Sequence, residues 1–370
     1  MKKAAIITFH ASHNYGSMLQ AYALQRTVEN MGIDCDIINL RTERQRDLYT
    51  VFTRRKGAKY IIKNLSHLAY YKPLTKKYNN FENFISSNMK LTENEYKTLE
   101  ELQNADLQYD YYISGSDQIW NPVPADFDWS YYLPFVKNGK RIAYAPSFGQ
   151  LSSTGDEETS EKIKQCLKEY DSIAVREKGS RENVSKLTGK SVDIVLDPTL
   201  LVSAEEWDKL LPKKRSVDGD YIFLYTLFAT PEIMKIAKYF SKKLGIPVVT
   251  SNFSNQIDVL NPFVKRYASG PSEFLDLVKN AKLVLASSFH GTVFSAIYKK
   301  PFFSVGGSKD ARISTLLDIL HLPERSIDID DYKNKIDNSF DIDYGNSEID
   351  KEIEHSMNYL KGALEVGDMQ

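Results

Sequence analysis

Four short polar loops hold most of the residues that could bind or transform a ligand. They cover residues 10–17, 114–121, 285–294 and 305–312, and each begins at the end of a short apolar run that predicts a strand. In parallel sheets, ligands bind beyond the carboxyl ends of the strands, where helix N-termini present their N–H groups. We therefore expect ligand contacts to come from these four loops.

One of these loops contains a histidine in a setting suited to proton transfer. His290 follows Ser287 and Ser288 closely, precedes Gly291, and lies where an apolar strand passes into a helix. Imidazole has an ordinary pKa of about 6.5, so it can donate or accept a proton at neutral pH. We predict that His290 is a functional acid/base; the alternative is a histidine with a purely structural role.

Three cationic side chains indicate that the ligand is a small anion. Lys309 and Arg312 follow the glycine pair of the 305–312 loop, and Arg176 ends the predicted strand 172–175. A guanidinium can bind a carboxylate or phosphate through two parallel hydrogen bonds. The alternatives are a solvated loop for Lys309 and Arg312, and a surface ion pair for Arg176.

The two loops of the N-terminal half carry polar groups of a different kind. Asp117 could hold a sugar hydroxyl or cap a helix, and Trp120 could stack on a sugar or pack in the core. Neither loop matches the phosphate-binding motifs GxGxxG and GxxxxGK[ST], which argues against a nucleotide site of those classes.

Metal ligands are sparse in this sequence. His10 and His13 lack a nearby third ligand, and the two cysteines, Cys35 and Cys166, have no CxxC partner. A zinc site needs three or four such ligands, so no metal is expected. So few cysteines also fit a reducing compartment.

Composition and charge limit the location and the partners. The chain has 48 Lys and Arg against 49 Asp and Glu, which argues against a dedicated nucleic-acid binder. Its apolar runs are too short for a secretory signal or a membrane span, so we expect a cytoplasmic protein. Residues 53–81 contain eight Lys or Arg and no acid, which indicates either a solvated helical face or a segment that contacts anionic lipid or a lipid-linked acceptor.

The elements that must position the four loops alternate between strand and helix. The segment 18–31 has helical spacing, with Ser17 and Gln20 as a capping box and Gly32 at its end. A length of 370 residues favours two domains, and the β–α rhythm predicts an α/β fold with mainly parallel sheets. Strands are predicted at 4–9, 35–40, 111–114, 142–145, 172–175, 192–196, 221–225, 247–250, 283–286 and 302–305.

An ordered set of short motifs runs along the chain. The motifs are Asn14-Tyr15-Gly16-Ser17 followed by Leu19–Leu24, then Gly115–Asn121, Ala143–Gly149, Val175-Arg176-Glu177, Leu196–Leu201 and Ser288–Thr292. Taken together, over about residues 5–320, these motifs resemble those of the polysaccharide pyruvyl transferase family. One departure is Ser287, where many relatives carry Asp.

The resemblance implies a glycosyltransferase-B-like fold, in which two Rossmann-like domains face each other across a cleft. Residues 1–205 would form the first domain, with 53–81 as an insertion, and 206–330 the second. Residues 331–370 would form a tail or helix that crosses back to the first domain. The implied reaction transfers a pyruvyl group from phosphoenolpyruvate to a sugar as a ketal and releases phosphate, without a metal or nucleotide cofactor.

The same resemblance suggests roles for individual residues. His290 and Arg176 would be catalytic. Phosphoenolpyruvate carries a carboxylate and a phosphate, so its pocket needs several charge-assisted donors. The residues that bind the donor would be Arg176, Ser288, Gly291, Thr292, Lys309 and Arg312. The acceptor sugar, which could be lipid-linked at the inner membrane face, would contact Asn14, Gly16, Ser116, Asp117 and Trp120.

Two other functions fit the same sequence features. One is a nucleotide-sugar-dependent glycosyltransferase on the same scaffold, which would bind a UDP- or GDP-sugar. The other is a non-catalytic sugar-binding subunit of a polysaccharide assembly system, which would tolerate loss of His290.

Overall fold

The chain divides into two compact units, each built on its own sheet. The computed structural model describes residues 2–53, 55–149, 156–227, 229–252, 262–338, 340, 342–345 and 347–367. The first unit comprises residues 1–49, 85–202 and 350–370, and the second comprises residues 50–84 and 203–349. The two units are described separately below.

The sheet of the first unit has seven strands in the order β3-β2-β1-β4-β5-β6-β7, and all neighbouring strands are parallel. This order begins like that of a Rossmann fold, with the chain changing direction between β1 and β4. β4 is buried along its whole length, as expected for a parallel strand covered on both faces. The strands are β1 Lys3–Ile7, β2 Asp34–Leu40, β3 Leu91–Tyr96, β4 Tyr111–Ser114, β5 Lys140–Tyr144, β6 Ser172–Val175 and β7 Asp193–Ile194.

Helices connect these strands, and the first of them begins earlier than the sequence predicts. Asn14 is the N-cap of α1, because its side-chain oxygen accepts hydrogen bonds from the backbone N–H groups of Gly16 and Ser17. The predicted capping box of Ser17 and Gln20 is therefore wrong. The helices of this unit are α1 Tyr15–Asn30, α2 Glu43–Tyr49, α5 Leu99–Asn104, α6 Glu157–Lys168, α7 Lys178–Thr188 and α13 Ile349–Ala363.

The second unit repeats the plan with six parallel strands in the order β10-β9-β8-β11-β12-β13. Here the change of direction falls between β8 and β11. The strands are β8 Ile222–Tyr225, β9 Val248–Thr250, β10 Val264–Lys265, β11 Leu283–Ala286, β12 Phe302–Val305 and β13 Ser326–Ile327. The helices are α3 Ala58–Ala69, α8 Ala204–Asp208, α9 Pro231–Leu244, α10 Pro271–Lys279, α11 Phe289–Ile297 and α12 Ala311–Ile319, while α4 Tyr71–Asn88 runs from this unit into the first.

The basic segment 53–81 belongs to the second unit, which differs from the expected insertion in the first domain. The Asn80 side chain donates to the carbonyl of Ala268 at 2.9 Å, and the Tyr70 ring packs edge-on against Tyr267. These contacts fix the segment to the second unit. Arg54, within the segment, lies outside the described residues.

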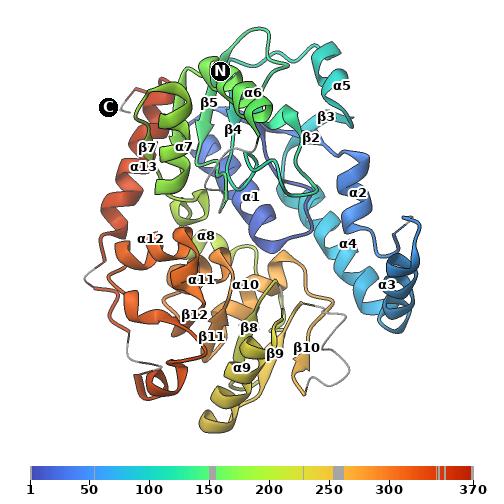
Figure 1. The fold of residues 1–370 in the computed structure, drawn as a ribbon, viewed down its shortest axis with the longest axis vertical. Coiled ribbons are helices and arrows are strands. Elements are labelled where there is room, and N and C mark those ends of the chain that lie inside the picture. The colour runs from blue at the N-terminus through green and yellow to red at the C-terminus, as the bar shows by residue number, and fades with distance from the viewer. Residues whose placement is uncertain are drawn as a thin grey trace. The chain divides into compact units, whose positions relative to one another are not determined.

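The C-terminal helix α13 packs on the first unit, although residues 203–349, which precede it, belong to the second unit (Figure 1). The Tyr359 hydroxyl donates to the carbonyl of Ala143 at 3.0 Å, and the Leu196 N–H donates to Ser356 Oγ at 2.9 Å. Residues 331–349 remain with the second unit. Within the part of the chain that the structure describes, no helix is long and apolar enough to cross a membrane.

Candidate functional site

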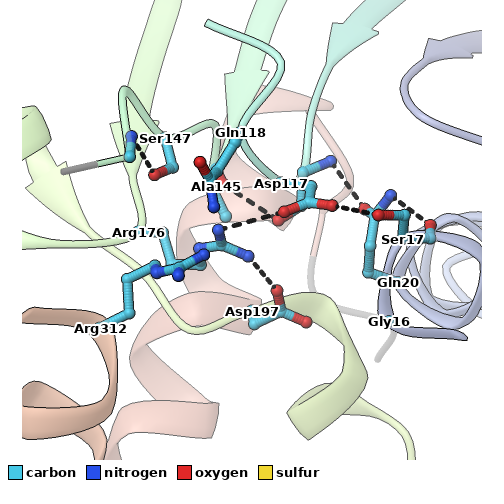
Figure 2. A network of polar contacts seen from close by, with 12 residues as sticks. Gly16, Ser17, Gln20, Asp117, Gln118, Ala145, Ser147, Arg176, Asp197 and Arg312 are labelled. Carbon is cyan, nitrogen blue, oxygen red and sulfur yellow. Dashed lines mark hydrogen bonds and ion pairs between the residues drawn. The ribbon is translucent and has the colours of Figure 1, made fainter. Parts of the chain in front are cut away.

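The first candidate site lies at the carboxyl ends of β1 and β4, where ligands bind in sheets of this order. Asp117 follows β4 with a positive φ of 78° and is only 6% exposed. Its carboxylate accepts hydrogen bonds from Ser17 Oγ (2.7 Å) and from Arg176 Nη2 (3.3 Å), as Figure 2 shows. Three separate elements therefore meet at this carboxylate: α1, the loop after β4 and the end of β6.

Arg176 forms the centre of a buried charge cluster. Its Nη1 donates to Asp197 Oδ2 at 2.7 Å, and its Nε lies 3.7 Å from Glu177 Oε2. Burial by itself lowers the pKa of Arg176, but the charges of Asp117 and Asp197 outweigh burial and raise it. The guanidinium therefore stays charged and holds these carboxylates in place. In this structure the fork faces carboxylates of the chain itself, so a contact between Arg176 and a bound anion stays a prediction.

The loop that carries Asp117 is fixed by a second set of hydrogen bonds. Gln20 Oε1 accepts from the Ser116 N–H (3.1 Å), and Gln20 Nε2 donates to Thr8 Oγ1 (2.9 Å). Thr8 Oγ1 in turn donates to the Ser116 carbonyl, and Ser116 Oγ donates to the Ala145 carbonyl, each at 3.0 Å. Ser116 therefore positions Asp117 from a fully buried place, which corrects its expected role as an acceptor contact.

A further carboxylate, which the sequence analysis missed, belongs to the same end of the first sheet. Asp126 Oδ2 accepts hydrogen bonds from the Tyr49 hydroxyl (2.9 Å) and from Ser12 Oγ (3.3 Å). Burial, with a contribution from the charge of Asp117, raises the pKa of Asp126. No local motif marks Asp126, because its partners come from distant parts of the sequence.

The remaining acceptor candidates have different settings. Trp120 is fully buried, stacks on Tyr132 with centroids 5.4 Å apart, and donates its indole N–H to Ser114 Oγ at 3.2 Å. It belongs to the hydrophobic core of the first unit, so the expectation that it contacts a sugar is wrong. Asn14 directly precedes α1 and caps it as described above, and Gly16 lies in the first turn of the helix.

The second candidate site lies at the carboxyl ends of β8 and β11, the corresponding switch point of the second sheet. The loop after β11 is joined to the loop after β8 by a hydrogen bond from Ser287 Oγ to Thr226 Oγ1 (2.7 Å). Ser288 is the N-cap of α11, and His290 lies in its first turn, 6% exposed and edge-on to the Phe289 ring. The N–H groups and the dipole of this helix end favour an anion beside the imidazole.

Gly291 and Thr292, which are expected to contact the donor, lie where α11 packs against the sheet of the second unit. A Cβ on Gly291 would lie 2.8 Å from the Ala286 Cβ and 2.8 Å from Tyr225 Cδ1, so only glycine lets α11 approach the sheet this closely. Thr292 is fully buried, and its hydroxyl is bonded to Ser304 Oγ at 2.7 Å. The buried Thr292 side chain is thus bonded within the second unit, which corrects its expected contact with the donor, whereas a donor contact through the backbone N–H of Gly291 stays a prediction. Ser288 stays a candidate through its place at the helix start.

The cations of the 305–312 loop are each paired with a carboxylate. Arg312 Nε and Nη2 donate to Asp310 at 3.0 and 2.6 Å, and its guanidinium lies over the Phe289 ring, 5.6 Å from the centroid. Lys309 Nζ lies 2.5 Å from Asp328, and its side chain is 73% exposed. The hydrogen bond to Asp328 raises the pKa of Lys309. Phe289 thus links Arg312 to His290, whereas Lys309 points to a different partner.

The predicted cationic group is therefore divided between the two units: Arg176 belongs to the first, and His290, Lys309 and Arg312 belong to the second. His10 is a core residue bonded to Asn39, and His13 packs against Tyr49. Across the described residues, no group of three or more His, Cys, Asp or Glu side chains could hold a metal ion.

Solved structures of other proteins share the fold of this chain. A UDP-GlcNAc 2-epimerase from Methanocaldococcus jannaschii matches with a TM-score of 0.54 at 12% identity, covering 97% of this chain and 100% of the other. The S. aureus MnaA–UDP co-structure matches with a TM-score of 0.54 at 10% identity, covering 100% of this chain and 99% of the other. At such low identity the likeness concerns the fold alone, which is α/β and glycosyltransferase-B-like, with two Rossmann-like sheets.

A family model identifies the chain more closely. The model for polysaccharide pyruvyl transferase matches residues 14–309, which include both candidate sites. The chain therefore belongs to the polysaccharide pyruvyl transferase family. A search of curated proteins gives no significant match.

Proposed function

We propose that the protein transfers the pyruvyl group of phosphoenolpyruvate onto a sugar of a polysaccharide or its precursor, as a ketal, with release of phosphate. The observation that carries this proposal is the position of His290, an imidazole in the first turn of a helix at the switch point of a parallel sheet, within the part matched by the family model. An anion-binding helix end beside a proton donor suits an enol phosphate.

The donor would bind at the second unit. The first turn of α11, starting at Ser288, would receive a negatively charged group of phosphoenolpyruvate, and His290 would donate a proton to the methylene carbon. Arg312, held beside His290 through Phe289, would add positive charge in competition with Asp310. Lys309 would contribute similarly after leaving Asp328.

The acceptor would bind at the first unit, where carboxylates predominate. Asp117 would accept the proton of the attacking sugar hydroxyl, while Arg176 and Ser17 keep its carboxylate in position. Asn14 and Gly16 border this site as the start of α1.

The steps balance without a metal or nucleotide. One sugar hydroxyl attacks C2 of the enol phosphate as its methylene carbon is protonated to a methyl group. The bond between C2 and the bridging oxygen of the phosphate then breaks, and a second sugar hydroxyl attacks C2 to close the ketal. Two hydroxyl protons are lost; one balances the new methyl hydrogen and the other leaves with phosphate. His290 would supply the first proton, a contribution worth about 10²–10⁴-fold in rate.

Phosphate release tests the proposal. The purified protein, mixed with phosphoenolpyruvate and a panel of sugars with two neighbouring free hydroxyls, should release phosphate only with a competent acceptor. His290→Ala should lose about 10²–10⁴-fold. His355→Ala is the matched control, since His355 is exposed on α13. Wild-type rates in His290→Ala would remove its role, and thermal stabilisation by UDP- or GDP-sugars instead of phosphoenolpyruvate would indicate a glycosyltransferase.

A further inference from the structure

Helix α3 is held in the structure with its polar face inward. The Asn64 side chain donates to the Thr53 carbonyl (3.0 Å) and accepts from the Thr53 N–H (3.1 Å). One turn further along, His67 Nδ1 is bonded to the Val51 carbonyl at 2.6 Å. These bonds attach the polar face to the preceding residues 51–53. A helix of a folded protein ordinarily turns its apolar face to the core, so this arrangement is unusual.

The opposite face of α3 is apolar and exposed. Ile61, Ile62, Leu65 and Leu68 are 60%, 67%, 60% and 61% exposed, respectively. Positions 61, 65 and 68 follow helical spacing and 62 lies beside them, so these four side chains form one stripe, the α3 apolar face. Such a contiguous apolar patch on a water-exposed helix marks a surface that binds something.

The charged residues of the segment that carries this face are all basic. Residues 53–81 contain eight Lys or Arg and no acid. Of these, Arg55 and Lys56 precede α3, and Lys72 and Lys76 follow in α4, and all four side chains are exposed. An exposed apolar helix face flanked by basic side chains has the composition of helices that lie in the interface of anionic membranes.

We propose that the α3 apolar face inserts into an anionic lipid bilayer and holds the protein against the membrane surface. Charge decides between the candidate occupants. Pairing of two copies through this face would bring two acid-free basic segments together, and like charges facing each other weaken association. Anionic headgroups instead provide the opposite charge, while the acyl region accepts the four aliphatic side chains. The proposal rests on α3 and its surroundings and is independent of the proposed reaction.

Vesicle flotation tests this proposal with the full-length protein. Vesicles of phosphatidylcholine mixed with phosphatidylglycerol should carry the wild type, and pure phosphatidylcholine should carry much less. The triple variant Ile62→Gln, Leu65→Gln, Leu68→Gln should lower partitioning into vesicles by about tenfold or more, because each replacement removes apolar area that the bilayer would bury. Val123→Gln is the matched control, since Val123 is 70% exposed elsewhere on the chain and should leave binding unchanged.

The charge contribution needs its own variants. Replacing Lys56, Lys72 and Lys76 with Gln should weaken binding to the anionic vesicles by about tenfold or more, and added salt should do the same. The control is the replacement of Lys97, Lys213 and Lys214, which are exposed in other segments. Equal losses in the two lysine triples would show a nonspecific charge effect and overturn the proposal.

A spectroscopic variant locates the contact. Leu65→Trp should place an indole in the acyl region, so brominated lipids should quench its added emission, whereas Val123→Trp should stay unquenched. Absence of flotation by the wild type, or unchanged flotation by the apolar triple variant, would overturn the proposal. A concentration-dependent dimer that the apolar triple variant disperses, without vesicle binding, would show that a second copy covers this face and would overturn it as well.

Discussion

Arg176 and Asp117 form a buried ion pair, with Nη2 and Oδ1 3.3 Å apart, although they follow different strands of the first sheet, β6 and β4. The same guanidinium binds Asp197 and lies near Glu177, so one cation faces three carboxylates. A site with surplus negative charge is a poor receptor for an anion and a good one for hydroxyl groups. This is the physical reason why the proposed function places the sugar at the first unit and the enol phosphate at the second.

Removing Arg176 should destabilise the protein strongly. Arg176→Ala leaves buried carboxylates without their cation, and breaking a buried pair in this way costs about 3–5 kcal/mol. Denaturant unfolding measures the loss, and Arg176→Lys should recover part of it because the charge is kept while the two-pronged geometry is lost. Arg44→Ala is the control, since Arg44 is exposed in α2. A loss below about 1 kcal/mol would contradict the structural role.

Asp117→Asn should impair the reaction through the acceptor. Under the proposed function, the amide cannot take up the hydroxyl proton, so kcat should fall by about 10²-fold or more. Ser17→Ala removes one hydrogen bond to Asp117 and should cost about 1 kcal/mol, or roughly fivefold in rate. Stabilisation by phosphoenolpyruvate in thermal unfolding should stay at the wild-type level in both variants. A parallel loss of that stabilisation would assign Asp117 to the donor instead.

Asp126→Asn should stabilise the protein at neutral pH. The raised pKa of Asp126 means that the folded state binds its proton more tightly than the unfolded state does. Stability from this group is present below the ordinary carboxyl pKa of about 3.9 and is lost as pH rises through the folded pKa. The amide oxygen can still accept from Tyr49 and Ser12. At about pH 7 the variant should therefore unfold at a higher denaturant concentration than the wild type. This difference should shrink as the pH falls toward about 4.

The control for this pH dependence is Asp218→Asn, in an exposed connector, which should leave stability unchanged. A stability difference for Asp126→Asn that stays constant between neutral and acidic pH would show that its effect comes from packing rather than ionisation.

Local sequence patterns predicted the fold well because the strand signals are local. The predicted strands Tyr111–Ser114, Ser172–Val175, Leu283–Ala286 and Phe302–Val305 are confirmed to the residue. The missed strands lack such a signal. β3, Leu91–Tyr96, is an edge strand with three consecutive exposed residues, and β10 and β13 have two residues each, so pairing with a neighbour defines them rather than their own composition.

The site was predicted less completely because its partners are distant in sequence. The loops were correctly placed after strands, yet Arg176 is 59 residues from Asp117 and 21 from Asp197, and nothing local signals that they meet. The spacing of Ser17 and Gln20 matched a capping box, but both side chains form tertiary hydrogen bonds instead. Ser17 donates to Asp117, and Gln20 accepts from the Ser116 N–H. Asp197 belonged to a family motif, which was the available signal for its importance.

Gly291→Ala should destabilise the protein even though alanine favours helices. The new Cβ would meet Ala286 and Tyr225 at 2.8 Å, and such overpacking costs about 1–3 kcal/mol. Gly179→Ala is the matched control: Gly179 lies in α7 with no atom within 4 Å of the added Cβ, so the variant should gain about 0.5–1 kcal/mol. Denaturant unfolding of both variants gives the comparison. Because Gly291 adjoins His290, the rate of phosphate release should also fall in Gly291→Ala, whereas Gly179→Ala should keep the wild-type rate. Equal stability of the two variants would show that α11 can move away from the sheet without a cost in folding free energy.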